Sequence, residues 1–254
     1  PEAYGPGVTD VVRVDNRGFG AAANAGMCLA LESSRAPVVV LNDDIEVTSG
    51  WLAPLLAALA ADAELGAVQP VLVFGEAGAI NSLGVELDRY GAGVDRGLGT
   101  PVDSLGPSEF IDVFTGGAVM FRPDFIDATG GFDERYFLYY EDVDLALRGA
   151  ELGGTYRCET ASLVVHAGGA TTADLGDDVV RLQERNRIWV AARFLPPATI
   201  GRALWLSLRR LRHAPNGAHA RALLGGLGGI PSSLARRLTA RRRSAPAIVS
   251  ADGR

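Results

Sequence analysis

Lysine is absent from this sequence, so all 24 of its basic residues are arginines. It has only two cysteines, Cys28 and Cys158, and three histidines. The two cysteines form no pair with metal-binding spacing, which argues against a cysteine-based zinc site. Each lies in an apolar or strand-like context, and this context favours a buried reduced thiol over a disulfide.

Long apolar runs are also missing. No run approaches the roughly 18 consecutive apolar residues that a membrane-spanning helix needs, and the segment Pro1 to Pro6 has neither the charged nor the apolar region of a signal peptide. We therefore expect a cytoplasmic protein, soluble or peripheral at the inner face of the plasma membrane. Its 254 residues and 48% hydrophobic content suffice for one large domain with a buried core, alone or with an appendage.

Acidic residues are nearly missing from the last part of the chain. From Arg185 onward there are 14 arginines and one acid, whereas the chain up to Glu184 has 10 arginines and 29 acids. The net charge of −6 thus combines an acidic body with a basic tail. Such a tail favours an anionic partner, either a membrane surface or nucleic acid. We expect no nucleic acid, because the tail lacks interleaved aromatic residues beyond Trp205.

Apolar runs of strand length alternate with helical patterns near the start. The sequence predicts strands over Val8 to Val14 and Pro37 to Leu41, and helices over Gly20 to Ser33 and Trp51 to Ala61. This alternation indicates an α/β fold with a mostly parallel sheet. Ligands of such sheets bind beyond the carboxyl ends of the strands.

The rest of the chain continues this pattern and ends in helices. We expect a loop-rich hairpin region over 75–106, a strand pair over 110–121 and a short helix from Pro123. A longer helix over 140–152, two short strands over 155–158 and 162–166, and a final helix over 177–194 should follow. Pro196 and Pro197 mark the clearest boundary. We therefore expect a domain over residues 1–195 and a basic amphipathic helical tail over 196–254.

Polar residues directly follow two predicted strands. Asn42, Asp43 and Asp44 come after the strand that ends at Leu41, and His166 ends a later strand. A carboxylate and a neutral imidazole at strand ends can hold Mg²⁺ or Mn²⁺ against phosphate oxygens. Taken alone, however, polar turn residues and a solvated histidine are equally ordinary at such places.

Acids at a predicted helix start give the second chemical motif. Glu141 and Asp142 follow Tyr140, and a carboxylate at such a position can take a proton from a bound hydroxyl group. Acids in a first helical turn also complement the helix dipole, which leaves a structural role open.

Glycines mark two further turns. Asn16, Gly18, Phe19 and Asn24 belong to a strand-to-helix turn whose glycines permit close backbone approach to a nucleotide. The turn at Gly116 and Gly117 separates two strands. In both turns the glycines can equally serve helix or strand packing.

Taken in their order along the chain, these five motifs resemble the catalytic core of the family 2 inverting glycosyltransferases of GT-A fold, especially the bacterial rhamnosyltransferase-like branch. The resemblance covers roughly Asp10 to Phe194. It implies a Rossmann-like nucleotide-sugar-binding domain, with Asp142 as the base beside Glu141, and with Asp44 and His166 on a divalent cation, Mg²⁺ or Mn²⁺. Around the donor it places Asn16, Gly18, Phe19, Asn24, Asn42, Asp43, Gly116 and Gly117.

The sequence also departs from the family pattern. Asn42 stands where the family has a first Asp, and Asp43 stands where it has Pro. Family members begin with βα units that are missing here, so we expect an N-terminally incomplete domain. The resemblance implies transfer of a sugar such as rhamnose from a nucleotide diphosphate sugar to a cell-surface glycan or polyprenyl-linked acceptor. The alternative is a catalytically silent, membrane-associated nucleotide-sugar-binding or scaffold protein.

Overall fold

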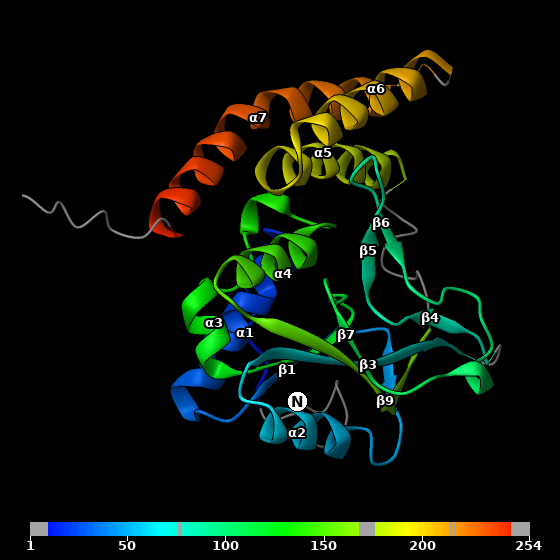
Figure 1. Cartoon of the computed structure of the whole chain (residues 1–254), viewed down its shortest axis with the longest axis vertical. Helices are drawn as coiled ribbons and strands as arrows, with labels where there is room; N and C mark the ends of the chain where they lie inside the picture. The colour runs from blue at the N-terminus through cyan, green and yellow to red at the C-terminus, as the bar shows by residue number, and fades with distance from the viewer. Residues whose placement is uncertain (1–9, 76–77, 168–175, 214, 216, 245–254) are drawn as a thin grey trace, which may run out of the picture. The chain divides into compact units, whose positions relative to one another are not determined.

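The computed structural model describes residues 10–75, 78–167, 176–213, 215 and 217–244 (Figure 1). The chain divides into two compact units. The first comprises Pro1–Glu86 and Val94–Asp174, and the second comprises Leu87–Gly93 and Leu175–Arg254. The unit boundary at Leu175 differs from the boundary that the sequence predicts after residue 195, because the predicted last helix of the domain groups with the tail.

In the first unit the helices α1 (Phe19–Ser33) and α2 (Leu52–Ala61) and the strand β1 (Val38–Leu41) lie where the sequence predicts them. The strands β2 (Ile45–Val47) and β3 (Leu65–Phe74) were not predicted, and one predicted strand is absent from the described residues. Residues 10–14, the described part of the predicted strand Val8 to Val14, are irregular and exposed; Val8 and Thr9 lie outside the described residues. The strand β4 (Ile80–Ser82) and the hairpin strands β5 (Val85–Leu87) and β6 (Gly93–Asp95) follow.

The later helices and strands lie close to the predicted positions, except that the last two predicted strands are one. They are η2 (Val102–Ser104), β7 (Glu109–Ile111), β8 (Ala118–Phe121), α3 (Pro123–Thr129), η3 (Glu134–Tyr136), α4 (Glu141–Glu151) and β9 (Thr155–His166). Pro123 begins α3, where its missing N–H costs nothing. The two short strands predicted over 155–166 are one strand, whose pairing with β3 shifts register between Pro70 and Val71.

Seven strands of the described chain form one mixed sheet in the order β1-β8-β3-β9-β2, with β4 beside β3 and β7 beside β9. β8 is antiparallel to both β1 and β3, so β1 and β3 run in the same direction, and β3 is parallel to β9. The expected mostly parallel sheet is wrong, since only the β3–β9 pair of this sheet is parallel. The reason is that β8 inserts between β1 and β3, and apolar periodicity does not identify a partner strand.

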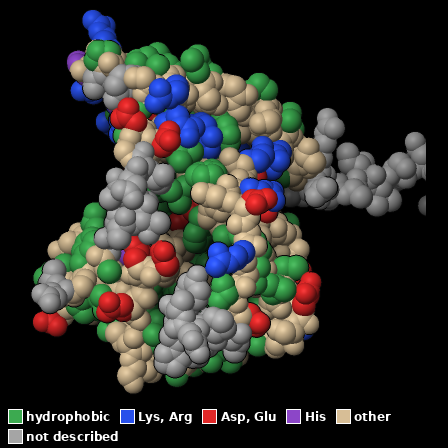
Figure 2. All heavy atoms as spheres, turned by 180° about the vertical axis from the view of Figure 1, so that it is seen from behind, with side chains coloured by type: hydrophobic (Ala, Val, Ile, Leu, Met, Phe, Trp, Pro, Cys, Tyr) green, Lys and Arg blue, Asp and Glu red, His purple; other side chains and the backbone are tan. Residues whose placement is uncertain are grey.

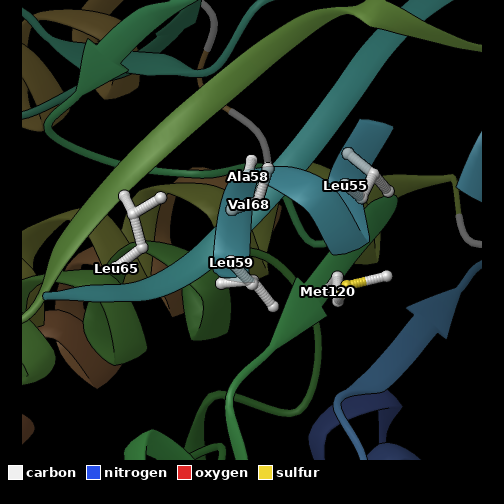
Figure 3. Packing of buried hydrophobic residues seen from close by; sticks show 6 residues of the cluster. All are labelled: Leu55, Ala58, Leu59, Leu65, Val68 and Met120. Atoms are coloured by element: carbon white, nitrogen blue, oxygen red, sulfur yellow. The ribbon is translucent and has the colours of Figure 1, made fainter. Parts of the chain in front are cut away.

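Helix α2 covers one face of the sheet, and its apolar residues recur at helical spacing. Figure 3 shows the resulting cluster: Leu55, Ala58, Leu59, Leu65, Val68 and Met120. Val68 and Met120 are paired across β3 and β8, and both point toward α2. Their strand neighbours Ala67 and Phe121 are equally buried. Because successive strand residues point to opposite faces, Ala67 and Phe121 form part of the other face.

Aromatic rings fill that other face beneath α3 and α4. Phe121 stacks on Phe125 with ring centroids 5.7 Å apart, and Phe114 meets Tyr156 edge-on at 5.0 Å. Gly66 is required here, since an added Cβ would lie 2.5 Å from the Phe125 ring. The sheet that carries the polar strand ends is therefore packed on both faces, and this packing fixes its strands.

The second unit is built from α5 (Asp177–Phe194), α6 (Pro197–His213) and α7 (Gly217–Ser244), together with the hairpin tip Leu87–Gly93. Two glycines of α7 let it approach α5 closely, since an added Cβ at Gly226 or Gly229 would lie 2.5 Å from Ile188 or 1.9 Å from Trp189. The predicted helical tail is thus a packed helical unit as far as residue 244; residues 245–254 lie outside the described part.

Two smaller expectations have different outcomes. Cys158 is buried as predicted, and burial raises the pKa of its thiol to about 12. Cys28 is exposed, which contradicts the prediction, because its side of α1 faces solvent. Within the described residues, no helix combines the length and apolar character needed to cross a bilayer.

Candidate functional site

Asp44 and His166 lie side by side although 122 positions separate them. β2 pairs with β9 so that Ile45 faces His166, and this register brings the residue before β2 to the end of β9. Nε2 of His166 lies 3.1 Å from Oδ2 of Asp44. The backbone closes the same corner, because the N–H of Ala167 donates to the carbonyl oxygen of Asp44 at 2.9 Å.

This corner has features that fit a divalent cation. Oδ1 of Asp44 is buried without a hydrogen-bond partner, and a buried carboxylate oxygen left in this way is costly unless a further group satisfies it. The described residues contain no cluster of three or more His, Cys, Asp or Glu side chains that could hold a metal by themselves. Two protein ligands still suit Mg²⁺ or Mn²⁺, which complete their coordination with water and substrate phosphates.

Asn81 orients the imidazole and was not found by sequence reasoning. Its Oδ1 lies 2.8 Å from Nδ1 of His166. An amide oxygen can only accept, so this contact keeps the proton on Nδ1 and leaves Nε2, which faces Asp44, available as a ligand. Asn81 lies on β4, in a stretch predicted as loops and a hairpin, and only its polar character between Ile80 and Leu83 hinted at a role.

The turn at Gly116 and Gly117 connects the metal corner to the acidic helix start. The carbonyl oxygen of Gly117 accepts a hydrogen bond from the N–H of Asn42 at 2.9 Å. The N–H of Gly116 donates to Oδ2 of Asp142 at 2.9 Å. An added Cβ at Gly116 would lie 3.3 Å from the Cβ of Asp142, so a side chain would press on the carboxylate. Two separate sequence motifs thereby become one site.

Asp142 has the properties of a proton acceptor. It is partly exposed, and its two oxygens accept hydrogen bonds from the backbone N–H groups of Gly116 and Val143 at 2.9 and 2.8 Å. Burial raises the pKa of Asp142, while these N–H groups lower it and the charge of Asp95 raises it further. A fixed carboxylate with a raised pKa is a stronger base than a solvated one.

Glu141 is buried beside Asp142, and its Oε2 has no hydrogen-bond partner. Burial, followed by the charge of Asp142, raises the pKa of Glu141 to about 8. At neutral pH Glu141 is therefore a protonated carboxylic acid. A protonated, buried acid cannot accept a proton, so Asp142 is the candidate base of the pair.

We expect the Glu141→Gln variant to lose a pH dependence of folding. The pKa of Glu141 is about 8 in the folded protein and 4.5 in the unfolded chain. The protonated side chain therefore stabilises the folded state fully below pH 4.5, and this stabilisation is lost as pH rises through 8. Relative to the variant, the free energy of unfolding of the wild type should fall by up to about 1.4 kcal/mol per pH unit in this window. Urea titrations at several pH values measure this, with the exposed Glu46→Gln as control. Parallel pH profiles for wild type and Glu141→Gln would contradict the assignment.

The segment before α4 holds strained backbone. Phe137, Tyr139 and Tyr140 have φ of 68°, 67° and 70°, a region that costs non-glycine residues about 1–3 kcal/mol each. Gly18 anchors this segment: its φ is 95°, and an added Cβ would lie 2.1 Å from the carbonyl oxygen of Phe137. That oxygen accepts from the N–H of Phe19 at 2.8 Å. Gly18 and Phe19 therefore hold the approach to Asp142.

The other residues predicted around the donor have different surroundings. Asn16 is exposed, and its Oδ1 accepts from the N–H of Gly18 at 3.3 Å. Asn24 uses its amide within the fold, donating to the carbonyl oxygen of Phe132 at 2.9 Å and accepting from its N–H at 2.8 Å. These bonds give Asn24 a structural role. Asp43 lies exposed on the turn after β1. Donor contacts by these residues stay predictions.

Asp95 is a second acid that sequence reasoning missed. It ends β6, and burial raises its pKa while a hydrogen bond from Ser82 and the nearby His166 lower it. Its charge also acts on Asp142. Asp95 thus belongs to the same electrostatic environment as the metal corner and the base. A lone acid in a glycine-rich hairpin gives no local signal of this.

Similar proteins are found by structure and not by sequence. No protein-family model and no curated protein matches the chain. Its structure is similar to that of GalNAc-T7 with UDP, GalNAc and Mn²⁺, with a TM-score of 0.54 and 13% identity over 91% of this chain and 45% of that chain. It also shows similarity to the mannosyltransferase PcManGT from Pyrobaculum calidifontis in complex with GDP-Man and Mn²⁺, with a TM-score of 0.46 and 15% identity over 91% and 66% of the two chains.

The first likeness establishes the fold. The chain has the GT-A glycosyltransferase fold with a helical C-terminal region, as the sequence analysis expected. It spans less than half the length of GalNAc-T7. The family 2 and rhamnosyltransferase-like assignments stay predictions.

Proposed function

We propose that this protein is a divalent-cation-dependent inverting glycosyltransferase that uses a nucleotide diphosphate sugar. The observation that carries the proposal is the convergence of Asp44, His166 and Asp142 at one edge of a GT-A sheet, joined through the turn at Gly116 and Gly117. The assignment to family 2 and to a rhamnosyltransferase-like branch rests on the sequence motifs. The Mn²⁺ in the GalNAc-T7 structure is consistent with the cation proposed here.

The reaction is a single displacement. The acceptor hydroxyl oxygen forms a bond to the anomeric carbon of the donor as the bond from that carbon to the diphosphate oxygen breaks, and the hydroxyl proton passes to Asp142. Inversion follows because the acceptor attacks opposite the leaving group. The backbone N–H of Gly116 holds the carboxylate of Asp142 for this transfer, and Glu141 remains protonated beside it.

The leaving diphosphate belongs at the metal corner. Asp44 and His166 would hold Mg²⁺ or Mn²⁺ there, and this cation would neutralise the developing charge on the diphosphate. Asn81 keeps the imidazole in the tautomer that can bind it. Asn42 and Asp43, on the turn after β1, are the nearest candidates in the sequence for contacts to the ribose or the diphosphate.

Nucleotide release tests this function directly. The purified protein is incubated with Mn²⁺ and each of a panel of UDP-, GDP- and dTDP-sugars, and the released diphosphate is measured with and without glycan or polyprenyl-phosphate-linked acceptors. Release that requires both Mn²⁺ and one donor supports the proposal. Binding of donors without any release would instead favour the catalytically silent binding or scaffold protein.

We further propose that the helical unit places the enzyme at an anionic membrane. Figure 2 shows arginine side chains interspersed with hydrophobic ones on these helices. Large apolar side chains of α6 and α7 are exposed: Trp205, Leu208, Leu224, Leu227, Leu234 and Leu238. Each arginine near an anionic surface contributes about 1 kcal/mol, in addition to apolar burial. The proposed polyprenyl-linked acceptor would be present in such a membrane.

We expect the intact protein to sediment with anionic liposomes at low salt and to be released as salt rises. The double variant Leu224→Ser with Leu238→Ser should reduce this binding, because both side chains are exposed, at 70% and 59%, and contribute apolar burial. Leu98→Ser in the first unit, which is 54% exposed, is the matched control. A folded protein that ignores anionic liposomes at low salt would end the membrane proposal.

A further inference from the structure

An open cavity of about 450 Å³ lies in the second unit, and none of the residues assigned to catalysis or to the cation lines it. This volume is within the range of small-molecule binding pockets. The lining residues are Arg89, Tyr90, Ala198, Gly201, Arg202 and Trp205. They come from two places in the sequence, the hairpin tip between β5 and β6 and the first half of α6. The composition is unusual, since two arginines and two aromatic rings meet without a lining carboxylate.

Tyr90 and Trp205 form a stacked aromatic pair at the cavity. The rings of Tyr90 and Trp205 are nearly parallel, with an interplanar angle of 15° and centroids 6.3 Å apart. Trp205 is half exposed, at 50%, so its ring is accessible. Arg89 lies 4.8 Å from the Tyr90 ring centroid, and Arg209 lies 5.4 Å from that of Trp205. The exposed part of the Trp205 ring can pack against the C–H groups of a sugar ring, whose hydrogens carry partial positive charge.

The hairpin tip is held rigidly within this unit. Oδ1 of Asp88 accepts hydrogen bonds from the N–H groups of Tyr90 and Ala92 at 2.7 and 2.8 Å. The buried guanidinium of Arg187 donates to the carbonyl oxygen of Tyr90 at 3.3 Å and to Oγ of Ser207 on α6 at 2.7 Å. Arg187 thus ties the two walls of the cavity together. A preorganised cavity loses little conformational entropy when a ligand binds.

The charge at the cavity is not neutralised by carboxylates. Among the described residues, Arg89 and Arg202 form no ion pair, whereas Arg181 and Arg210 of the same unit pair with Asp178 and Glu184. Helices α6 and α7 contain no acidic residue. An anion that carries phosphate oxygens would satisfy two guanidinium groups, because planar guanidinium donors match phosphate geometry.

We propose that this cavity binds a glycosyl phosphate, with the sugar ring against the exposed part of Trp205 and the phosphate between Arg89 and Arg202. This inference rests on the proposed function: the ligand is the phosphate-linked end of the acceptor. The assignment narrows the acceptor class from glycans in general to phosphate-bearing ones. The same chemistry occurs in soluble sugar phosphates and in polyprenyl-diphosphate-linked sugars, and the experiment has separate arms for the two.

The Gly201→Leu variant gives the sharpest test, because an added Cβ at Gly201 meets no atom within 4 Å. Because Gly201 lines the cavity, a leucine there is expected to take up part of its space. Gly228→Leu on α7 is the matched control, since an added Cβ at Gly228 also meets no atom within 4 Å and Gly228 does not line the cavity. The Arg89→Gln and Arg202→Gln variants remove one charge each.

Binding is measured by calorimetry with glucose 1-phosphate, with glucose as the neutral counterpart, and with vesicles of neutral lipid containing a polyprenyl-diphosphate-linked sugar. We expect Gly201→Leu to abolish binding, each arginine variant to weaken it roughly 10-fold or more, as for other charge-assisted hydrogen bonds, and Gly228→Leu to bind as wild type does. Glucose alone should bind weakly or not at all. Tighter binding of the vesicles than of glucose 1-phosphate would identify the lipid-linked source, and the reverse order would identify the soluble one.

Two outcomes would overturn the inference. One is wild-type binding of both phosphate ligands by Gly201→Leu, and the other is equal binding of glucose and glucose 1-phosphate. Measuring donor hydrolysis without acceptor distinguishes a failure of the cavity proposal from a failure of the proposed function. It should proceed at the wild-type rate in Gly201→Leu, because none of the catalytic groups lies in the cavity. If the wild type hydrolyses no donor, the proposed function fails whatever the cavity binds.

Discussion

Replacing Asp142 with Asn is expected to reduce turnover at least about 100-fold, the effect of removing a general base. The amide has the same size, and its oxygen can still accept the hydrogen bond that Gly116 donates at 2.9 Å, whereas the bond from Val143 at 2.8 Å, at the partly exposed helix start, is lost. The variant should therefore fold normally and bind the donor with nearly unchanged affinity, because the base acts on the acceptor and not on the diphosphate. Steady-state rates and donor affinity, measured on the same preparation, check this expectation.

The exposed Asp103→Asn provides the control for the Asp142 variant. Asp103 lies in η2, on the surface, and no role at the site is assigned to it. It should keep the wild-type rate. A fully active Asp142→Asn would remove Asp142 as the base, and a loss of donor affinity equal to the loss of rate would indicate that Asp142 contacts the donor instead.

Asp44 and His166 are expected to act as a single unit in Mn²⁺-dependent nucleotide binding. Their side chains lie 3.1 Å apart, and one oxygen of Asp44 is buried without a partner. Replacing either residue with Ala should therefore weaken nucleotide binding in Mn²⁺, and the double variant should be little worse than the poorer single one, since groups that hold one ion are not additive. Titration of nucleotide at fixed Mn²⁺, and of Mn²⁺ at fixed nucleotide, measures the coupling.

Asn81 adds a graded variant to the metal experiment. Loss of the side chain that holds a ligating histidine typically weakens metal binding 10- to 100-fold, so Asn81→Ala should lie between the wild type and His166→Ala. Asn81→Asp keeps an accepting oxygen toward Nδ1 and should retain most of the affinity. Fully additive losses for Asp44→Ala and His166→Ala would show that only one of them is a ligand.

The sequence was sufficient for much of the local structure. Proline at a helix start, helical apolar spacing in α2 and α4, and short β-branched runs predict elements close to those observed, because each signal depends on neighbouring residues. The GT-A fold and the juxtaposition of strand ends follow from the order of the motifs. The exceptions are the strands β2 and β3, which were not predicted, and the predicted strand over Val8 to Val14, whose described residues are exposed and unpaired with the sheet.

The order of the strands in the sheet could not be predicted from local sequence patterns. β1 and β3 run the same way, as a strand, helix, strand pattern predicts, yet β8 lies between them. A strand signal reports the period of apolar residues and not the partner. The mixed sheet could therefore be found only from the register of distant segments, such as Leu41 opposite Ala118.

The tertiary structure decided which polar residues belong to the site. Asn81 and Asp95 lie in a region that reads as loops, and they act only because β4 and β6 bring them to His166. Asn24 was predicted to contact the nucleotide, but its side-chain amide forms hydrogen bonds with the backbone of Phe132.

The sequence by itself thus determined most helices, several strands and the α/β fold class of this protein, since these depend on residues close in the chain or on motif order. Only the tertiary structure decided the protonation of Glu141, the orientation of His166 and the cavity at Trp205. Each depends on burial and on contacts between segments far apart in the chain, such as the 85 positions between Asn81 and His166. Burial and distant contacts are products of packing, which no local pattern encodes.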